Sequence, residues 1–87
     1  MPNHKSAIKR VRQNEKRRVR NRQILATART YIKRVRAAVD SGDVAEAQAA
    51  LPAAVRALNS ASSKGVMHRN QAARKISRLT KAVNGLG

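Results

Sequence analysis

Basic side chains are concentrated near the start of this chain, where nine of the eighteen residues from 5 to 22 are Lys or Arg. A single carboxylate, that of Glu15, lies among them. Lys and Arg neutralise phosphates, and Arg can hold a phosphate through two parallel hydrogen bonds. The chemistry that these residues can perform is therefore the binding of a large polyanion. The nine are Lys5, Lys9, Arg10, Arg12, Lys16, Arg17, Arg18, Arg20 and Arg22.

The spacing of the bases predicts a helix that is charged on several sides. At about 100° per residue, steps of three and four residues place side chains on one helical face. A helix without an apolar stripe has no protein partner to pack against, so something other than a core must hold it. A helix inserted between several phosphate backbones could use every charged side. One row is Lys5, Lys9, Arg12, Lys16 and Arg20, a second is Arg18, Arg22, Arg29, Lys33 and Arg36, and Arg10 and Arg17 lie between the two.

Three helices, at about 4–41, 43–63 and 67–84, are expected to position these residues. No Gly or Pro interrupts residues 3–41, and an apolar stripe begins near Ile24. The first helix is therefore predicted to pack with its C-terminal half and to project with its N-terminal half. The predicted inward stripes are Leu25, Ala28, Ile32, Val35 and Val39 in the first helix, Val44, Ala47, Leu51, Val55 and Leu58 in the second, and Ala72, Ile76, Leu79 and Val83 in the third.

Local signals mark the ends of these helices. Gly42 suits the position after a helix, where positive φ is common. Asp43, followed three residues later by Glu46, predicts a capping box for the second helix. Pro52 predicts a kink near Leu51, because proline removes a helical hydrogen bond. The third helix carries a further basic row outside its stripe, formed by Arg74, Arg78 and Lys81.

These elements predict an all-α fold, an antiparallel three-helix bundle with an overlong, basic N-terminal helix. The 87 residues allow one small domain, spanning residues 1–87. Tyr31 is the only aromatic residue, and there is no Phe or Trp. The core is therefore thin, and the stability of the isolated chain is expected to be marginal.

The composition excludes several classes of function. A formal net charge of +16 is typical of a nucleic-acid binder. The chain has no cysteine, and His4 and His68 have no companions for a metal site, so we expect no metal and no cofactor. No nucleophile is paired with a base, which argues against an enzyme and a small-molecule substrate. No apolar run approaches the roughly 20 residues of a membrane span, and a cytosolic protein without homo-oligomers is expected.

Three interpretations of the basic stretch remain open at this point. It could be a solvated or disordered run that a partner orders. It could compact duplex DNA without sequence preference, as an architectural protein does. Folded RNA is favoured, because the chain lacks any helix, finger or wedge motif that reads DNA, and because Asn21 and Asn70 could reach sugars and 2′-hydroxyls.

Three segments resemble the bacterial small-subunit ribosomal proteins of the S-twenty family. The first is Asn3-His4-Lys5-Ser6-Ala7, which runs into Lys9-Arg10 and Glu15-Lys16. The second is Arg29-Thr30-Tyr31-Ile32-Lys33-Arg34-Val35, followed by Ala37-Ala38 and Gly42-Asp43. The third is Lys64-Gly65-Val66-Met67-His68-Arg69-Asn70, which continues through Ala72-Ala73-Arg74 to Leu79-Thr80. The resemblance covers essentially the whole chain.

The resemblance implies a three-helix bundle that binds 16S ribosomal RNA directly and early in assembly of the small (30S) subunit. Its long first helix would insert among RNA helices near the base of the subunit body. His4, Ile8, Arg36 and Pro52 depart from the family pattern. Carried over by position, the RNA-facing residues are Lys5, Ser6, Lys9, Arg10, Lys16 and Asn21 on one surface, and Lys64, His68, Arg69, Asn70 and Arg74 on a second.

Overall fold

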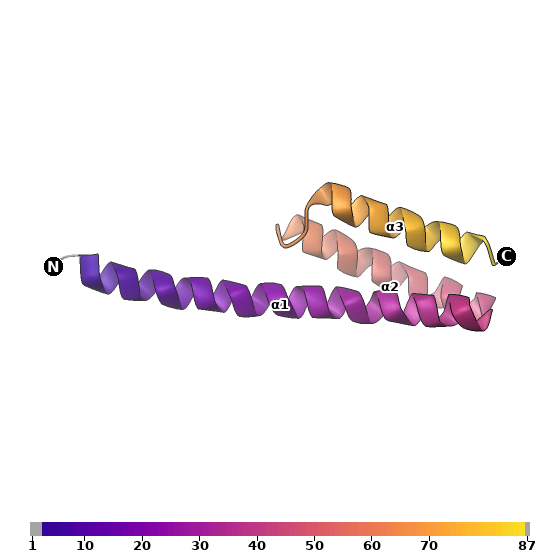
Figure 1. The fold of residues 1–87 in the computed structure, drawn as a ribbon, viewed down its shortest axis with the longest axis horizontal. Coiled ribbons are helices and arrows are strands. Elements are labelled where there is room, and N and C mark those ends of the chain that lie inside the picture. Colours follow the sequence, from indigo (N-terminus) through magenta and orange to yellow (C-terminus); the bar gives the residue numbers. More distant parts are fainter. Residues whose placement is uncertain (1–2, 87) are drawn as a thin grey trace.

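The computed structural model describes residues 3–86, with side chains from Ala7 to Leu86, and over this range the chain is a bundle of three helices. They are α1 (Asn3–Ser41), α2 (Val44–Ser63) and α3 (Arg69–Asn84). Successive helices run in opposite directions, so α1 and α3 point the same way (Figure 1). The predicted all-α class with an overlong first helix is confirmed. None of the described helices is long and apolar enough to cross a membrane.

The N-terminal half of α1 extends beyond the other two helices (Figure 1). All residues from Ala7 to Arg20 are exposed, and the first buried residue after Ala7 is Ala28. At 1.5 Å per residue, residues 3–20 project about 27 Å. We call this segment, residues 3–20, the arm. It gives the molecule its elongated dimensions of 65 × 20 × 14 Å.

Both interhelical turns end a helix in the same way. Gly42, with φ of 73°, donates its N–H to the carbonyl of Val39, and Asp43 donates to the carbonyl of Ala38. Gly65, with φ of 74°, and Val66 repeat this pattern onto the carbonyls of Ser62 and Ala61. These paired bonds form a Schellman motif, which requires a left-handed residue and therefore favours glycine.

The start of α2 corrects the predicted capping box. The Asp43 carboxylate accepts the N–H of Glu46 at 3.1 Å, so the cap itself is present. The reciprocal bond is missing because the Asp43 N–H is already donated to Ala38 across the Schellman turn. As a cap, Asp43 is extended, and α2 begins at Val44 rather than at residue 43.

The start of α3 differs from the predicted position for the same reason. His68 precedes the helix as its N-cap with extended backbone, so α3 begins at Arg69 rather than at about residue 67. Helix α2 continues without interruption through the exposed Pro52. The kink at Leu51 stays a prediction.

Helix α2 is the centre of the bundle, because it contacts both α1 and α3 extensively while those two barely touch. Its buried residues are Ala47, Ala54, Leu58 and Ala61. The predicted stripe was therefore wrong at Val44 and Val55, which are only half-buried. Small alanine side chains let helix backbones approach closely. The face of α2 that is rich in alanine, although only weakly hydrophobic, is therefore the one that is buried.

The stripes predicted for α1 and α3 agree better with the structure. Val35, Ala28, Leu79 and Val83 are buried, and Ile32 and Ile76 pack against this cluster. Leu25 is half-buried and lies outside the cluster. The core is thus short and aliphatic. Helix α1 contributes to it only with the part that follows the arm.

Leu79→Asp should unfold the bundle. Leu79 is 4% exposed, and an unpaired carboxylate there should lower the free energy of unfolding by roughly 4 kcal/mol or more. Thermal melts followed by circular dichroism measure the loss. Ala73→Asp, which adds the same charge at an exposed position of α3, is the matched control and should melt near the wild-type temperature. Equal melts for both variants would show that α3 packs through another face.

Amides of the arm should exchange with solvent far faster than those of residues 28–41 in the free protein. No described side chain of another helix covers residues 7–20, and like charges three and four residues apart weaken an isolated helix. Hydrogen exchange followed by mass spectrometry tests this. Strong protection along the arm would contradict it, whereas protection confined to the bundle is the expected result.

Candidate nucleic-acid interface

The arm carries positive charge on several sides. The described side chains show one ion pair there, in which the Arg18 guanidinium donates to the Glu15 carboxylate at 2.7 Å. Both side chains are more than half exposed, so this pair contributes little to stability. The other described bases of the arm are exposed. The predicted site residues that are exposed here are Lys9, Arg10, Arg12, Lys16, Arg17, Arg18 and Arg20.

Two predicted site residues, Lys5 and Ser6, belong to the first turns of α1. Their backbone is helical, but their side chains lie outside the described residues. Along the rest of α1, Arg22, Arg29 and Lys33 are exposed. The long helix therefore presents bases from the arm into the bundle without a break.

The structure gathers a second group of bases where the arm joins the bundle. The α2–α3 loop lies beside this part of α1 (Figure 1). Arg20 and Lys64 line one hollow, His68 and Arg69 line a second, and Arg29 faces Lys75 across a third. We call the region that holds these three hollows the neck; its bases are Arg20, Arg29, Lys64, His68, Arg69 and Lys75. It brings together residues that the sequence places some 40 positions apart.

His68 is the N-cap of α3 at the neck. Its Nδ1 accepts the N–H of Asn70 at 3.1 Å and caps α3. That nitrogen therefore carries no proton, and Nε2 is the ring atom left to donate to a phosphate or a hydroxyl. The exposed start of α3 adds Arg69 and Asn70, with Arg74 a turn further on. A helix N-terminus also favours anions through its free N–H groups.

Asn21 lies at the boundary between the arm and the bundle. Its side chain is half-buried, and its Oδ1 is enclosed without a hydrogen-bond donor among the described residues. An enclosed oxygen without a donor costs roughly 1–3 kcal/mol. A position on the inward stripe would be more stable with an aliphatic side chain. Retaining an amide there fits a residue that meets a polar partner.

The acidic residues lie at the opposite end of the bundle from the neck. Three of the four acids in the chain, Asp40, Asp43 and Glu46, cluster at the α1–α2 turn. Arg78, a predicted site residue, lines a hollow there with Arg36 and Asp40. The structure thus separates Arg78 from the neck, whereas it brings Lys64, His68, Arg69 and Arg29 together.

One neck residue was missed by sequence reasoning. Lys75 is half-buried and lines the cleft between α1 and α3, although it belongs neither to the inward stripe nor to the basic row predicted for α3. Its position directly before Ile76, on the flank of the apolar stripe, was the available signal. A base beside a core stripe lies near the neighbouring helix rather than in free solvent.

Fold and charge together define a class, that of small helical proteins built to bind an extended polyanion through a projecting helix. A family model described as "Ribosomal protein S20" matches residues 2–84. The chain belongs to this family.

Full-length relatives agree with this assignment. The chain is 56% identical over 87 residues to the small ribosomal subunit protein bS20 of Geotalea uraniireducens, with both chains fully covered. It is 55% and 52% identical, again over the full length of both chains, to the proteins of that name from Trichlorobacter lovleyi and Geobacter sulfurreducens. The resemblance seen in the three sequence segments is thereby confirmed.

Asn21→Leu should stabilise the free bundle and weaken binding to RNA. The change removes an enclosed oxygen without a donor and extends the apolar stripe, so a gain of about 1 kcal/mol is expected. Chemical denaturation measures the stability, and filter binding measures the affinity. Asn59→Leu, at an exposed position of α2, is the control and should gain nothing. A loss of stability in Asn21→Leu would show that the amide is satisfied in the folded protein.

Proposed function

We propose that this protein is a structural constituent of the small ribosomal subunit that binds 16S ribosomal RNA directly and helps to fold and hold it during assembly. The relatives named small ribosomal subunit protein bS20 support this role. The protein acts in the cytoplasm as part of the ribosome, and it is not an enzyme. Residues 1–87 work as one RNA-binding unit.

The observation that carries the proposal is the arm. Its described bases are exposed and lie on several sides of the helix, and no described helix covers them. A single duplex groove would engage only some of these sides. Folded RNA, in which several helices approach one another, offers phosphates on all of them. The arm therefore inserts between RNA helices, and the bundle holds its far end.

The neck supplies a second RNA-binding surface at the base of the arm. Lys64, His68 and Arg69 lie on the α2–α3 loop and the start of α3 and face outward. Contacts to phosphate and sugar set the position and orientation of the protein but read no sequence. Binding at two connected surfaces fixes the bundle against the RNA as well as the arm within it.

Removing residues 1–20 tests this mechanism. The truncation deletes eight of the twenty bases but none of the buried residues, so the bundle should still melt cooperatively. If the full chain contacts roughly six to ten phosphates, its affinity for 16S RNA should fall on the order of a thousandfold between about 50 and 200 mM salt. The truncated protein should bind far more weakly, with a shallower dependence on salt.

Matched controls separate this mechanism from simple charge attraction. Arg10→Gln should reduce the salt slope by about one, whereas Arg56→Gln, on α2 and outside the proposed interface, should leave it nearly unchanged. The test RNA is compared with an unstructured RNA of equal length and with duplex DNA. Equal affinity for all three would reduce the protein to a generic polycation, and preference for DNA would favour the compaction alternative.

A further inference from the structure

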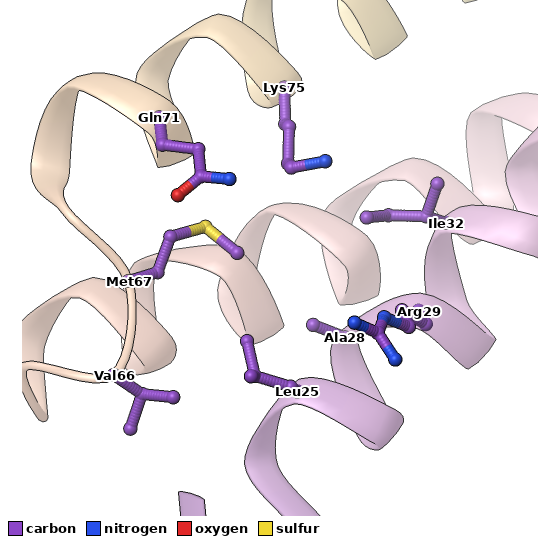
Figure 2. Close-up of a pocket in the computed structure, with 8 residues that line it drawn as sticks. All are labelled: Leu25, Ala28, Arg29, Ile32, Val66, Met67, Gln71 and Lys75. Atoms are coloured by element: carbon purple, nitrogen blue, oxygen red, sulfur yellow. The ribbon is translucent and has the colours of Figure 1, made fainter. Parts of the chain in front are cut away.

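A cleft of about 200 Å³ opens between α1 and α3 beside the α2–α3 loop. Figure 2 shows Leu25 and Ile32 of α1 and Met67 of the loop directed into the same space. The thioether of Met67 points into its middle. Arg29 of α1 and Gln71 and Lys75 of α3 form the polar part of the lining.

The cleft follows from the arrangement of the bundle. Because α2 holds α1 and α3 separately and these two scarcely meet, the groove between them is not closed by side chains at the loop end. Leu25, Ile32 and Met67 are only half-buried there. In a chain with so small a core, leaving three large apolar side chains partly open is a loss of stability that an occupant would reverse.

The lining combines an apolar interior with cations and one amide. Arg29 and Lys75 face the cleft from its two walls, and none of the lining residues is acidic. Three of the chain's acids lie at the far turn, and Glu15 is bound to Arg18 on the arm. The Gln71 amide supplies both a donor and an acceptor. The complementary ligand is flat and apolar on its faces, polar at its edge and joined to negative charge.

We propose that this cleft receives one unpaired nucleobase of the bound RNA, with its flanking phosphates held by Arg29 and Lys75. The base lies against Met67, Leu25 and Ile32, and Gln71 hydrogen-bonds its edge. Unstacked bases are the part of RNA that proteins read by sequence, commonly by packing their faces against side chains. A soft thioether suits such a face where no aromatic residue is available.

The size of the cleft and its charge select this occupant. Sites for drug-sized ligands measure about 300–1,000 Å³, so this one admits a single small ring system. A free phosphate would gain nothing from the apolar interior. An aliphatic side chain from a neighbouring protein would make no use of the two cations or of the amide. The proposal rests on the proposed function, because it names a nucleotide of the same RNA.

Photo-crosslinking through methionine tests the occupant directly. The chain has two methionines, Met1 and Met67, so incorporation of a diazirine analogue of methionine puts one probe in the cleft. Small subunits reconstituted with the labelled full chain are irradiated, and crosslinks are mapped by mass spectrometry and reverse-transcription stops. The matched control is Met67→Leu, which keeps the probe at Met1 and fills the cleft with a similar volume.

A crosslink to the base of one unpaired nucleotide, absent from the control, is the expected result. A crosslink from the cleft to a peptide of another protein would overturn the proposal in favour of a protein side chain. Incorporation into subunits without any crosslink beyond the control would also overturn it, while leaving the RNA-binding function intact. Failure of the labelled chain to bind small-subunit RNA at all would instead reject the proposed function.

Substitutions in the cleft provide a second, independent test, which measures affinity for RNA. Leu25→Trp fills the cleft without changing charge, so affinity for folded RNA should drop about tenfold while the salt slope stays constant. Gln71→Ala, at an exposed position, should lower affinity several-fold and broaden base preference at one nucleotide. Gln48→Ala, equally exposed on α2, should change neither. Unchanged binding by both cleft variants would overturn the proposal.

Discussion

Electrostatic repulsion within the chain is the constraint on which the rest of this structure depends. Twenty bases oppose four acids in 87 residues, and three of those acids lie at the turn farthest from the arm. Among the described side chains, only Glu15 offsets the bases of the arm, and its ion pair with Arg18 is exposed and weak. The negative charge that balances the arm must therefore come from a binding partner. The arm is joined to the bundle by the continuous helix α1, which sets its direction.

The bundle opposes that repulsion with a small hydrophobic core. Alanines on α2 allow close approach, and Leu58, Val35 and Val83 are the largest fully buried side chains. A core of this size cannot stabilise long polar helical extensions in several directions. It lies along the C-terminal half of α1, and one Schellman turn after α1 and another after α2 reverse the chain. Residues 7–20 of α1 stay exposed and are available to a partner.

Sequence alone predicted the parts of this structure that depend on local periodicity. The break at Ile24 between a charged and an amphipathic half of α1 could be seen from spacing, and so could the stripe through Leu79. The inward face of α2 could not, because its alanines are compatible with either burial or exposure. Which face is buried depends on how closely α1 and α3 approach, and this is a property of the assembled bundle.

The same distinction applies to the interface. The charges of the arm are adjacent in sequence, so they could be predicted as one site. The neck joins Arg20 and Arg29 to Lys64 and Lys75, and only the reversal of the chain at Gly42 and Gly65 brings them together. Lys75 was missed because its orientation toward α1 is decided by the packing of Ile76.

Binding and folding are linked in such a protein. RNA that binds the folded bundle but not the unfolded chain adds its binding free energy to a small intrinsic stability. The neck would make this linkage effective, because a ligand bound there would meet α1, α3 and the loop between α2 and α3. An RNA held at the neck opposes separation of the helices, whereas one held only by the arm would not. The position of the neck, at the open end of a thin core, is therefore where a bound polyanion stabilises the fold most.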